Sequence, residues 1–472
     1  METATTTIQP SGTAIDALPS RLGDSRKKFQ SGLTKTYAWR RDKLLRLKAL
    51  IQQHENEIYA ALQKDLHKSK EETYATEVGI MLAEINHALK HLKSWMRPKR
   101  VGTNLVNLPS SSFIYAEPLG VVLIIGPWNY PFMLLLSPCV GAIAAGNTVV
   151  LKPSEYAPAT ARVINKMISS AFDPAEIMVA EGDGAVVVPA MMKQFTFDHV
   201  FFTGGTAVGK IIYEMAASKL VPVTLELGGK SPCIVESDAN IKVAARRIAM
   251  TKFSNAGQMC IAPDYILVHE SRKEQFVTAM KQVIVEFFSA NPEESDNYCR
   301  IVNERQYERL AKYLGQGNIL FGGQTNAEKK YIAPTLMDEI PAEAAILQEE
   351  IFGPILPILT FNQRQEALDI IARNPNPLSF YVYTNSSKLE EEWINAVSFG
   401  GGCVNNSSWH FTNPDLPFGG RGKSGIGAAH GKWSFDCFTH RKAVMKTPTW
   451  FDPALKYPPF GGKLWLFKKL IR

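Results

Sequence analysis

The residues whose types and surroundings most clearly suggest catalysis are a cysteine and a glutamate. Each lies in a polar stretch that contains glycine. Cys260 ends the run Asn255-Ala256-Gly257-Gln258-Met259-Cys260, whose glycine lets the backbone come close to a substrate. Glu226 lies earlier, in Leu225-Glu226-Leu227-Gly228-Gly229-Lys230. A thiol and a carboxylate suggest a nucleophile and a general base. Each also has a structural interpretation, because single cysteines are often core residues and a glutamate before Gly-Gly often belongs to a turn.

The bulk composition narrows the classes of protein. A chain of 472 residues exceeds one ordinary core, so we expect two or three domains. Its net charge of +7 is mild, and no Lys/Arg block with interleaved aromatics suggests nucleic-acid binding. The six cysteines fall in no metal-ligand spacing, which predicts no metal site. Without a signal-peptide pattern we expect reduced thiols, a cytoplasmic location and a loose tail over residues 1–20.

The uncharged stretch 118–151 could be mistaken for a membrane span. Gly126-Pro127, Pro131, Ser137-Pro138 and Gly146-Asn147 interrupt it, and lipid could not satisfy the backbone at those breaks. We therefore predict a buried strand–helix–strand unit.

The elements that must position the two reactive residues alternate along the chain. Residues 33–98 have helical periodicity, and 99–117 predict a strand hairpin. Apolar strands (120–125, 148–151, 177–180, 199–202) then alternate with helices (132–145, 159–172, 186–193). This alternation predicts an α/β fold with a parallel, doubly wound sheet. A second alternating region covers about 227–420, with strands at 265–269 and 380–384. Residues 433–450 alternate again and could pair with 99–117.

Two strand ends could bind a dinucleotide, because ligands lie at the carboxyl ends of such strands. Strand 148–151 leads into Lys152-Pro153-Ser154-Glu155, where an acid could bind ribose hydroxyls. Strand 199–202 leads into Thr203-Gly204-Gly205-Thr206, whose glycines could admit a phosphate at a helix N-terminus. The spacing is not GxGxxG, so a plain turn with a helix cap remains an alternative.

Seven motifs in this order resemble the aldehyde dehydrogenase superfamily, over roughly residues 30–450. They are Pro127-Trp128-Asn129-Tyr130-Pro131, Leu151-Lys152-Pro153-Ser154-Glu155, Phe202-Thr203-Gly204-Gly205-Thr206, Leu225-Glu226-Leu227-Gly228-Gly229-Lys230, Gly257-Gln258-Met259-Cys260, Glu349-Glu350-Ile351-Phe352-Gly353-Pro354 and Pro417-Phe418-Gly419-Gly420. The short N-terminal region, Cys260-Ile261-Ala262-Pro263-Asp264-Tyr265, Arg300-Ile301-Val302-Asn303-Glu304-Arg305 and the motif from His430 to Lys442 resemble the class 3 branch, which includes fatty aldehyde dehydrogenases.

The resemblance implies a mechanism for oxidising an aldehyde to a carboxylic acid with NAD(P)+. The Cys260 thiolate would add to the aldehyde carbon, and the Asn129 amide with the Cys260 N–H would hold the oxyanion. Hydride transfer to the nicotinamide would leave a thioester on Cys260. Glu226 would then activate the water that hydrolyses it.

The resemblance also implies the cofactor site. Glu350 would bind the nicotinamide ribose beside Phe352, and Lys152 and Glu155 would bind the adenosine ribose. The remaining cofactor residues would be Gly204, Gly205, Gly209 and Leu227. Glu155 would favour NAD over NADP by bonding the 2′-hydroxyl, so we expect NAD to be preferred and NADP tolerated. This chain departs from relatives at Gly205, where many have Ser, and at Cys299, where class 3 relatives usually have Gly.

The family organisation implies the domains and a homodimer. We expect a cofactor domain over 21–98 and 118–226, a catalytic domain over 227–420, an oligomerisation arm over 99–117 and 421–450, and a tail over 451–472. The apolar tail with basic residues could contact a membrane surface, cap the substrate mouth or pack on the body. Its sequence is Lys463-Leu464-Trp465-Leu466-Phe467-Lys468-Lys469-Leu470-Ile471-Arg472.

The expected substrate is a medium- or long-chain aliphatic or an aromatic aldehyde, because the expected funnel residues are apolar or aromatic. These residues are Tyr130, Met133, Trp409, Phe411 and Phe418; their alternative role is core packing. Two other functions remain open. An acylating dehydrogenase would pass the thioester to coenzyme A, but the presence of Glu226 as a water-activating base argues against it. A non-enzymatic protein could retain the fold, but it would be expected to have lost Cys260 or Glu226, and both are present.

Overall fold

The computed structural model describes residues 15–471, and its first large element is a six-stranded sheet. Strands β7 (Val223–Glu226), β6 (His199–Thr203), β3 (Val121–Ile125), β4 (Thr148–Lys152) and β5 (Ile177–Val179) are parallel, and the short β17 (Gly425–Ile426) is antiparallel to β7. All of the β3 and β4 residues are buried, as the uncharged stretch predicts. The carboxyl ends of β4, β6 and β7 lie together at one edge.

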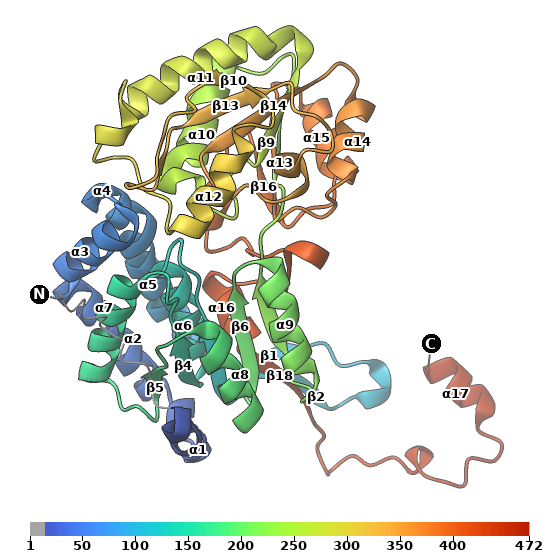
Figure 1. The fold of residues 1–472 in the computed structure, drawn as a ribbon. Helices are drawn as coiled ribbons and strands as arrows, with labels where there is room; N and C mark the ends of the chain where they lie inside the picture. Colours follow the sequence, from blue (N-terminus) through green and yellow to red (C-terminus); the bar gives the residue numbers. More distant parts are fainter. Residues whose placement is uncertain (1–14, 472) are drawn as a thin grey trace, which may run out of the picture.

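Helices cover both faces of this sheet, so the doubly wound prediction is confirmed (Figure 1). Val122 and Ile124 belong to the core shared with α2 (Tyr37–Gln53), α5 (Gly79–Trp95), α6 (Met133–Ala145) and α7 (Pro158–Ala171). Val121 and Leu123 point to the opposite core, shared with α1 (Leu18–Gln30), α8 (Gly184–Gln194) and α9 (Thr206–Ala217). This alternation follows from the two-residue side-chain period of a strand.

The N-terminal helices form one long, interrupted layer. After α3 (Glu55–Leu66), the chain runs through α4 (Lys70–Thr73), a π-helical turn (Tyr74–Val78) and α5 without a break. Single π-turns inside α-helices are frequent at functional sites. This one carries Glu77, which is fully buried below the segment that leads into α6.

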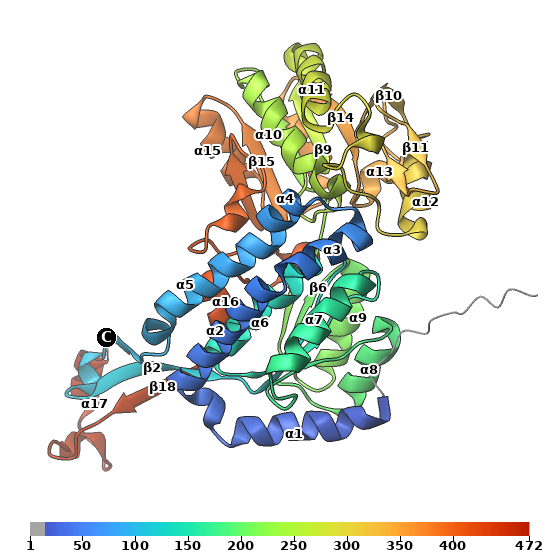
Figure 2. The same cartoon turned by 90° about the vertical axis from the view of Figure 1, so that its left-hand side faces the viewer.

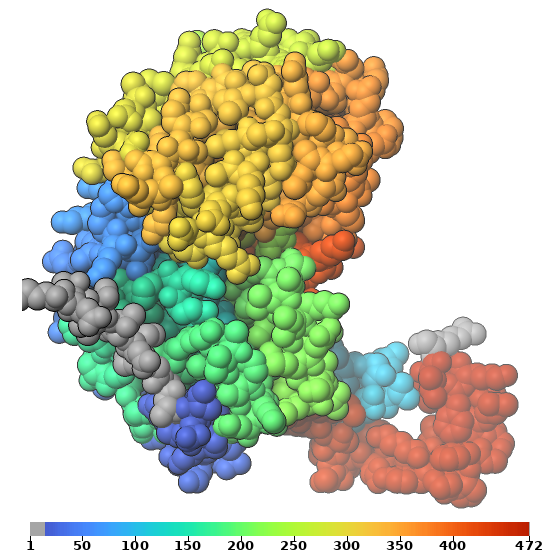
Figure 3. Space-filling model, in the orientation of Figure 1, coloured from blue at the N-terminus to red at the C-terminus, as the bar shows by residue number. Residues whose placement is uncertain are grey.

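The second large sheet has seven strands, in the order β10 (Asn318–Phe321), β13 (Thr335–Asp338), β14 (Ile355–Phe361), β9 (Tyr265–His269), β8 (Pro232–Val235), β15 (Ser379–Tyr383) and β16 (Gly401–Val404). One face packs on α10 (Ile241–Phe253), α11 (Lys273–Phe288) and α12 (Glu304–Tyr313). The other packs on α14 (Arg364–Ala372) and α15 (Ser387–Ala396). The helix α13 (Ala345–Gln348) and the hairpin β11 (Thr325–Asn326)–β12 (Tyr331–Ile332) complete this region. Figure 3 shows it as a yellow-to-orange lobe above the blue-to-green one.

A third sheet projects from the body (Figure 2). It consists of β1 (Lys99–Val101), β2 (Ser111–Pro118) and β18 (Thr439–Lys446), with Phe113 opposite Val444. Pairing between 99–117 and the chain end is therefore present. The expected strand does not begin at 433, however, because Gly431–Cys437 forms helix α16. Its Phe435 and the following Phe438 are buried in the core that contains α6. Their spacing of three residues is typical of a helix, whereas a strand would bury every second residue.

The C-terminal tail lies apart from the lobes and ends in α17 (Leu464–Leu470; Figures 1 and 3). None of the α17 residues is buried, so the interpretation as a packed tail is wrong for the single chain. Across residues 15–471, no helix is both long and apolar enough to cross a membrane.

Candidate active site

The loop that carries Cys260 follows α10 and has a strained backbone. Asn255 and Ala256 both have φ of 50°, and Gly257 has φ of 71°. Left-handed backbone is uncommon for residues with side chains and persists where the surroundings fix it. A Cβ on Gly257 would lie 2.2 Å from the Gly353 carbonyl oxygen. The close approach that requires this glycine is therefore to the chain's own backbone, whereas the sequence led us to expect an approach to the substrate.

Hydrogen bonds within the loop, and between the loop and the segments around Asn129 and Arg300, hold it in place. The Asn129 side-chain amide donates to the Gln258 carbonyl at 3.0 Å, and the Asn255 amide donates to the same oxygen at 3.1 Å. Asn255 also donates to the Asn129 carbonyl at 2.8 Å, while the Gln258 amide donates to the Arg300 carbonyl at 3.0 Å. Asn129 is thus tied to Gln258, which stands two residues before Cys260 in the sequence.

The Cys260 thiol lies in surroundings that favour its neutral form. Burial raises the pKa of Cys260, and the carboxylates of Glu350 and Glu226 raise it further. These contributions place both acids within electrostatic range of the sulfur. Because a thiolate is the nucleophilic form, the thiol proton must move to a base before attack.

Glu226 ends β7, and its side chain is only 5% exposed. Neither carboxylate oxygen has a hydrogen-bond partner within the described part of the chain. Burial raises the pKa of Glu226 well above its usual range. A buried carboxylate without partners is costly, so its survival here suggests a group that binds water or accepts a proton.

The Glu350 carboxylate lies against the Gly228 backbone, close to the end of β7. Burial raises its pKa to about 8, with a further contribution from Asp264, while the Gly229 N–H opposes the shift. A Cβ on Gly228 would lie 2.1 Å from the Glu350 carboxylate, so only glycine allows this approach. Phe352, at φ of 49°, places its ring edge-on to Trp128 at 5.2 Å.

Lys152 and Glu155 lie at the carboxyl end of β4, and Gly204 and Gly205 follow the carboxyl end of β6. The buried Lys152 ammonium donates to Glu155 at 3.1 Å and to the Pro153 carbonyl at 2.7 Å. Gly205 precedes α9 and has open space around it.

Two of the glycines expected at the cofactor, Gly204 and Gly209, pack against the end of β7. The Gly204 N–H donates to the Glu226 carbonyl at 3.0 Å, and a Cβ on Gly209 would lie 2.6 Å from Leu227. An open helix N-terminus beside a lysine–glutamate pair fits the phosphates and ribose of a nicotinamide dinucleotide.

One apolar cavity contains Cys260 and all five residues expected to contact the substrate: Tyr130, Met133, Trp409, Phe411 and Phe418. Met259, Ile80 and Leu134 extend its apolar lining, and its volume is about 240 Å³. Asn129, Glu226 and Glu350 do not line this cavity, so the expected acid–base and cofactor groups approach the thiol from elsewhere. Cys260 is thus the one cysteine that the described residues place in this mostly apolar lining.

Comparison with known proteins identifies the family. The model of the aldehyde dehydrogenase family matches residues 17–444. The chain belongs to the aldehyde dehydrogenase family. It is 47% identical to a 4,4′-diaponeurosporen-aldehyde dehydrogenase of Staphylococcus aureus over 97% of this chain and 100% of that protein. It is 44% identical to aldehyde dehydrogenase family 3 member H1 of Arabidopsis thaliana, over 94% and 93% of the two chains.

A solved aldehyde dehydrogenase supports the fold as well. A structure described as a substrate-bound state of Staphylococcus aureus AldH superposes with a TM-score of 0.94 at 46% identity, covering 98% of this chain and 100% of that one. The protein is therefore an NAD(P)-dependent aldehyde dehydrogenase of the class 3 type that oxidises aldehydes to carboxylic acids.

Sequence reasoning missed a buried polar cluster below the aldehyde dehydrogenase site. Lys68 and Glu77 form an ion pair at 2.6 Å with both side chains fully buried. Glu77 also accepts the Phe132 N–H at 2.9 Å, and the Lys68 ammonium lies 4.2 Å from the centre of the Tyr130 ring. The cluster fixes Tyr130 in the cavity wall. The charged helix pattern alone could not reveal it, because its burial depends on a contact with α6.

Cys299 acquires a structural role. Its thiol donates to Glu72 at 3.4 Å, and the other Glu72 oxygen accepts the Asn255 N–H at 2.7 Å. Burial raises the pKa of Glu72. The cysteine that departs from class 3 relatives thus supports a carboxylate that holds the strained nucleophile loop.

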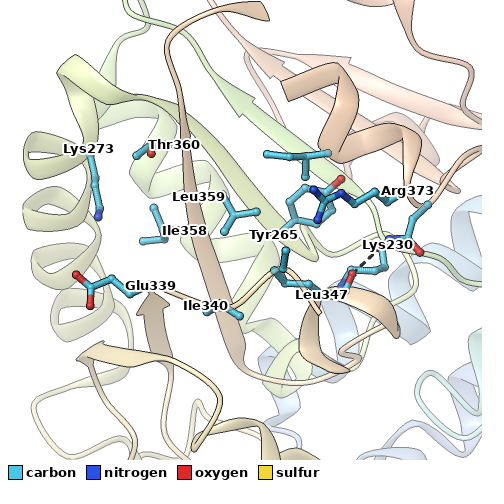
Figure 4. A pocket seen from close by; sticks show the side chains of 13 residues that line it. Lys230, Tyr265, Lys273, Glu339, Ile340, Leu347, Ile358, Leu359, Thr360 and Arg373 are labelled. Carbon is cyan, nitrogen blue, oxygen red and sulfur yellow. Dashed lines mark hydrogen bonds between the residues drawn. The ribbon is translucent and has the colours of Figure 1, made fainter. Parts of the chain in front are cut away.

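A separate cavity lies beside β14 and α14 (Figure 4). Lys230 points into it but is paired with Asp264, and Lys273 pairs with Asp338 at 2.6 Å. No cysteine lines this cavity, so it offers no thiol for aldehyde oxidation. No group of three or more potential metal ligands occurs between residues 15 and 471.

Proposed function

We propose that Cys260, Asn129 and Glu226 carry the oxidation of medium- or long-chain aliphatic or aromatic aldehydes. The observation that supports this most directly is that Cys260 lines the apolar cavity, with Asn129 tied to its loop. Cys260 attacks the aldehyde carbon, and the Asn129 amide with the Cys260 N–H stabilises the oxyanion. Glu226 then takes a proton from the water that hydrolyses the thioester.

The bound NAD(P)+ supplies the hydride acceptor. The chain's own residues hold it: Lys152 and Glu155 at the adenosine ribose, the open turn before α9 at the phosphates, and Glu350 at the nicotinamide ribose. We place Phe352 beside the nicotinamide, because its ring is already held against Trp128.

The experiment that tests this function is reduced-nicotinamide formation from NAD+ with hexanal, decanal and benzaldehyde, beside a Cys260→Ser control. Turnover that increases from hexanal to decanal and is lost in the control supports the assignment. Turnover only in the presence of coenzyme A would support the acylating alternative, and NAD+ binding without turnover would support a non-catalytic role.

The cofactor preference follows from Glu155. A carboxylate at the end of β4 accepts hydrogen bonds from a ribose 2′-hydroxyl and repels a 2′-phosphate. We therefore propose that NAD is preferred and NADP tolerated, the tolerance arising from the neighbouring Lys152, which the structure pairs with Glu155. The test is the ratio of kcat/KM for the two cofactors. Glu155→Gln should move that ratio toward NADP, and an unchanged ratio would remove Glu155 from the argument.

We also propose a homodimer built through the three-stranded sheet. Strand β18 has its outer edge open, and an unpaired edge of eight residues is a surface that proteins normally cover. A monomeric mass by light scattering at micromolar concentration would contradict this.

The tail gives a further proposal, contact with an anionic membrane surface. Leu464 and Trp465 are 65% and 67% exposed, and Lys468 and Lys469 lie in the last turn of the same helix. Deletion of residues 463–472 should reduce sedimentation with phosphatidylserine vesicles. If it instead changes only the activity on long chains, the tail is a cap over the substrate mouth. We place the enzyme in the cytoplasm, where its free thiols would stay reduced.

A further inference from the structure

A second cavity adjoins the one that contains Cys260. It lies between the first turns of α5 and the segment around Pro414, and its volume is about 270 Å³. The two cavities share a boundary of Ala75, Ile80, Phe411, Thr412 and His430. A chain that extends from the thiol past Phe411 would therefore reach this second cavity.

Glu84 gives the second cavity a polar wall. Its side chain comes from α5 and is 8% exposed. One carboxylate oxygen accepts the Gly431 N–H at 2.9 Å, and the other has no hydrogen-bond partner among residues 15–471. Burial raises the pKa of Glu84 to about 7. The free oxygen is a hydrogen-bond acceptor in the wall of this cavity.

His430 lines both cavities and is 9% exposed. Its ring packs against Phe418 at 5.2 Å and Phe411 at 6.1 Å, and neither ring nitrogen has a hydrogen bond in the described chain. Burial lowers the pKa of His430 to about 4, so the ring is neutral near pH 7 and keeps one N–H donor. The backbone of His430 has φ of 77°, an uncommon conformation for a residue with a side chain.

Glu84 also has a purely structural interpretation as the acceptor for the first N–H of α16. That role needs a single oxygen, and the side-chain carbonyl of glutamine would serve it without burying a titratable group. The free oxygen of Glu84 and the unpartnered imidazole of His430 are not explained by the anchoring role. Together they offer one acceptor and one donor in the cavity that adjoins the apolar lining around Cys260.

We infer that this second cavity binds a hydroxyl group at the end of the substrate remote from the aldehyde. The hydroxyl donates to Glu84 and accepts from the His430 N–H, while the carbon chain fills the cavity beside Cys260. The preferred substrates are then long aldehydes with a terminal hydroxyl. This inference rests on the proposed function, because it needs the aldehyde carbon at Cys260.

The test compares each hydroxylated aldehyde with its plain counterpart by kcat/KM, for 3-hydroxypropanal against propanal, 8-hydroxyoctanal against octanal, and 10-hydroxydecanal against decanal. Wild-type enzyme should show no preference for the hydroxylated three-carbon substrate and a preference of roughly tenfold once the chain reaches Glu84. A ratio near one at every length would overturn the inference. Absence of decanal oxidation would instead count against the proposed function.

The decisive variant is Glu84→Gln, which keeps an acceptor for the Gly431 N–H and places an amide donor toward the cavity. We expect it to abolish most of the long-chain hydroxyl preference. Asp415→Asn is the matched control, because it removes an exposed carboxylate close to the same segment and should leave the preference intact. Should Glu84→Gln fail to fold, His430→Phe replaces it, since the ring packing is kept and the donor is lost. A preference retained in the folded variant would overturn the inference.

Discussion

The loop of Cys260 and the carboxylate of Glu226 show opposite ways of holding a reactive group. Hydrogen bonds from Asn129, Asn255 and Gln258 fix the loop, and its backbone is strained at two successive residues. Glu226 is only 5% exposed, yet neither of its carboxylate oxygens has a hydrogen-bond partner among residues 15–471. A nucleophile must be fixed in place to attack one carbon atom. A base that acts on water must keep its lone pairs free for that water, and the lack of partners around Glu226 provides this.

Removing the Cys260 thiol, the reactive group that is fixed in place, should have the largest effect on activity. Cys260→Ser replaces a thiol with a much less acidic hydroxyl, and we expect kcat to fall by about 10⁴-fold or more. The folded state should be unaffected, because the substitution is close to isosteric. The measurement is steady-state aldehyde oxidation, with the thermal unfolding temperature as the control. Activity within tenfold of wild type would remove Cys260 from the mechanism.

Removing the Glu226 carboxylate, whose oxygens have no hydrogen-bond partner among residues 15–471, should separate thioester formation from thioester hydrolysis. Glu226→Gln keeps the side-chain shape but cannot take a proton from water, so kcat should fall by roughly 10²- to 10⁴-fold. Thioester formation on Cys260 does not require that water. We therefore expect one rapid equivalent of reduced nicotinamide per active site, followed by slow turnover, in stopped-flow absorbance. Loss of the rapid phase as well would show that Glu226 is also needed before the thioester forms.

Asn129 connects the two cases, because it holds the loop and is proposed to donate to the oxyanion. Asn129→Ala removes one oxyanion donor, for which we expect a loss of about 10²- to 10³-fold in kcat. The Gln258 carbonyl keeps its bond from Asn255, so the loop should stay folded. Asn129→Asp, which retains size but loses the donor, should lose activity to a similar extent. If kcat remains and only the unfolding temperature falls, Asn129 is a structural residue alone.

The pH dependence should reflect the same pair of groups. Burial raises the pKa of both Cys260 and Glu226, and each must lose its proton to act. Their charged forms are therefore favoured as pH rises, and the rates of thioester formation (through Cys260) and of its hydrolysis (through Glu226) should each increase by up to about tenfold per pH unit on the acidic side of the profile. In Glu226→Gln the burst rate should still rise with pH through Cys260. A burst rate that is flat between pH 6 and 9 would contradict a neutral resting thiol.

The features that depend on local sequence patterns could be predicted from the sequence. Apolar runs indicated the doubly wound sheet, and the motifs around Cys260 and Glu226 indicated the family. Burial by distant segments could not be predicted. Lys68 and Glu77 look like solvated helix residues until α6 covers them, and residues 433–437 look like strand until Phe435 packs on that helix. The absence of partners around Glu226 is likewise a property of the assembled fold and of no single motif.

The smallest expected effect concerns the support of the nucleophile loop from outside. Glu72→Ala leaves the Asn255 N–H without its acceptor, which should cost about 1–3 kcal/mol of stability and reduce kcat severalfold through a less well positioned Cys260. Glu72→Gln keeps an acceptor oxygen and should recover most of both losses. Cys299→Ser keeps a donor to Glu72, whereas Cys299→Gly removes it and should fall between the two glutamate variants. Chemical unfolding together with kcat orders these four proteins. If Glu72→Ala and Glu72→Gln are equal in both measurements, the hydrogen bond to Asn255 does not fix the loop, and the strain at Asn255 and Ala256 must be held by the Asn129 and Gln258 bonds alone.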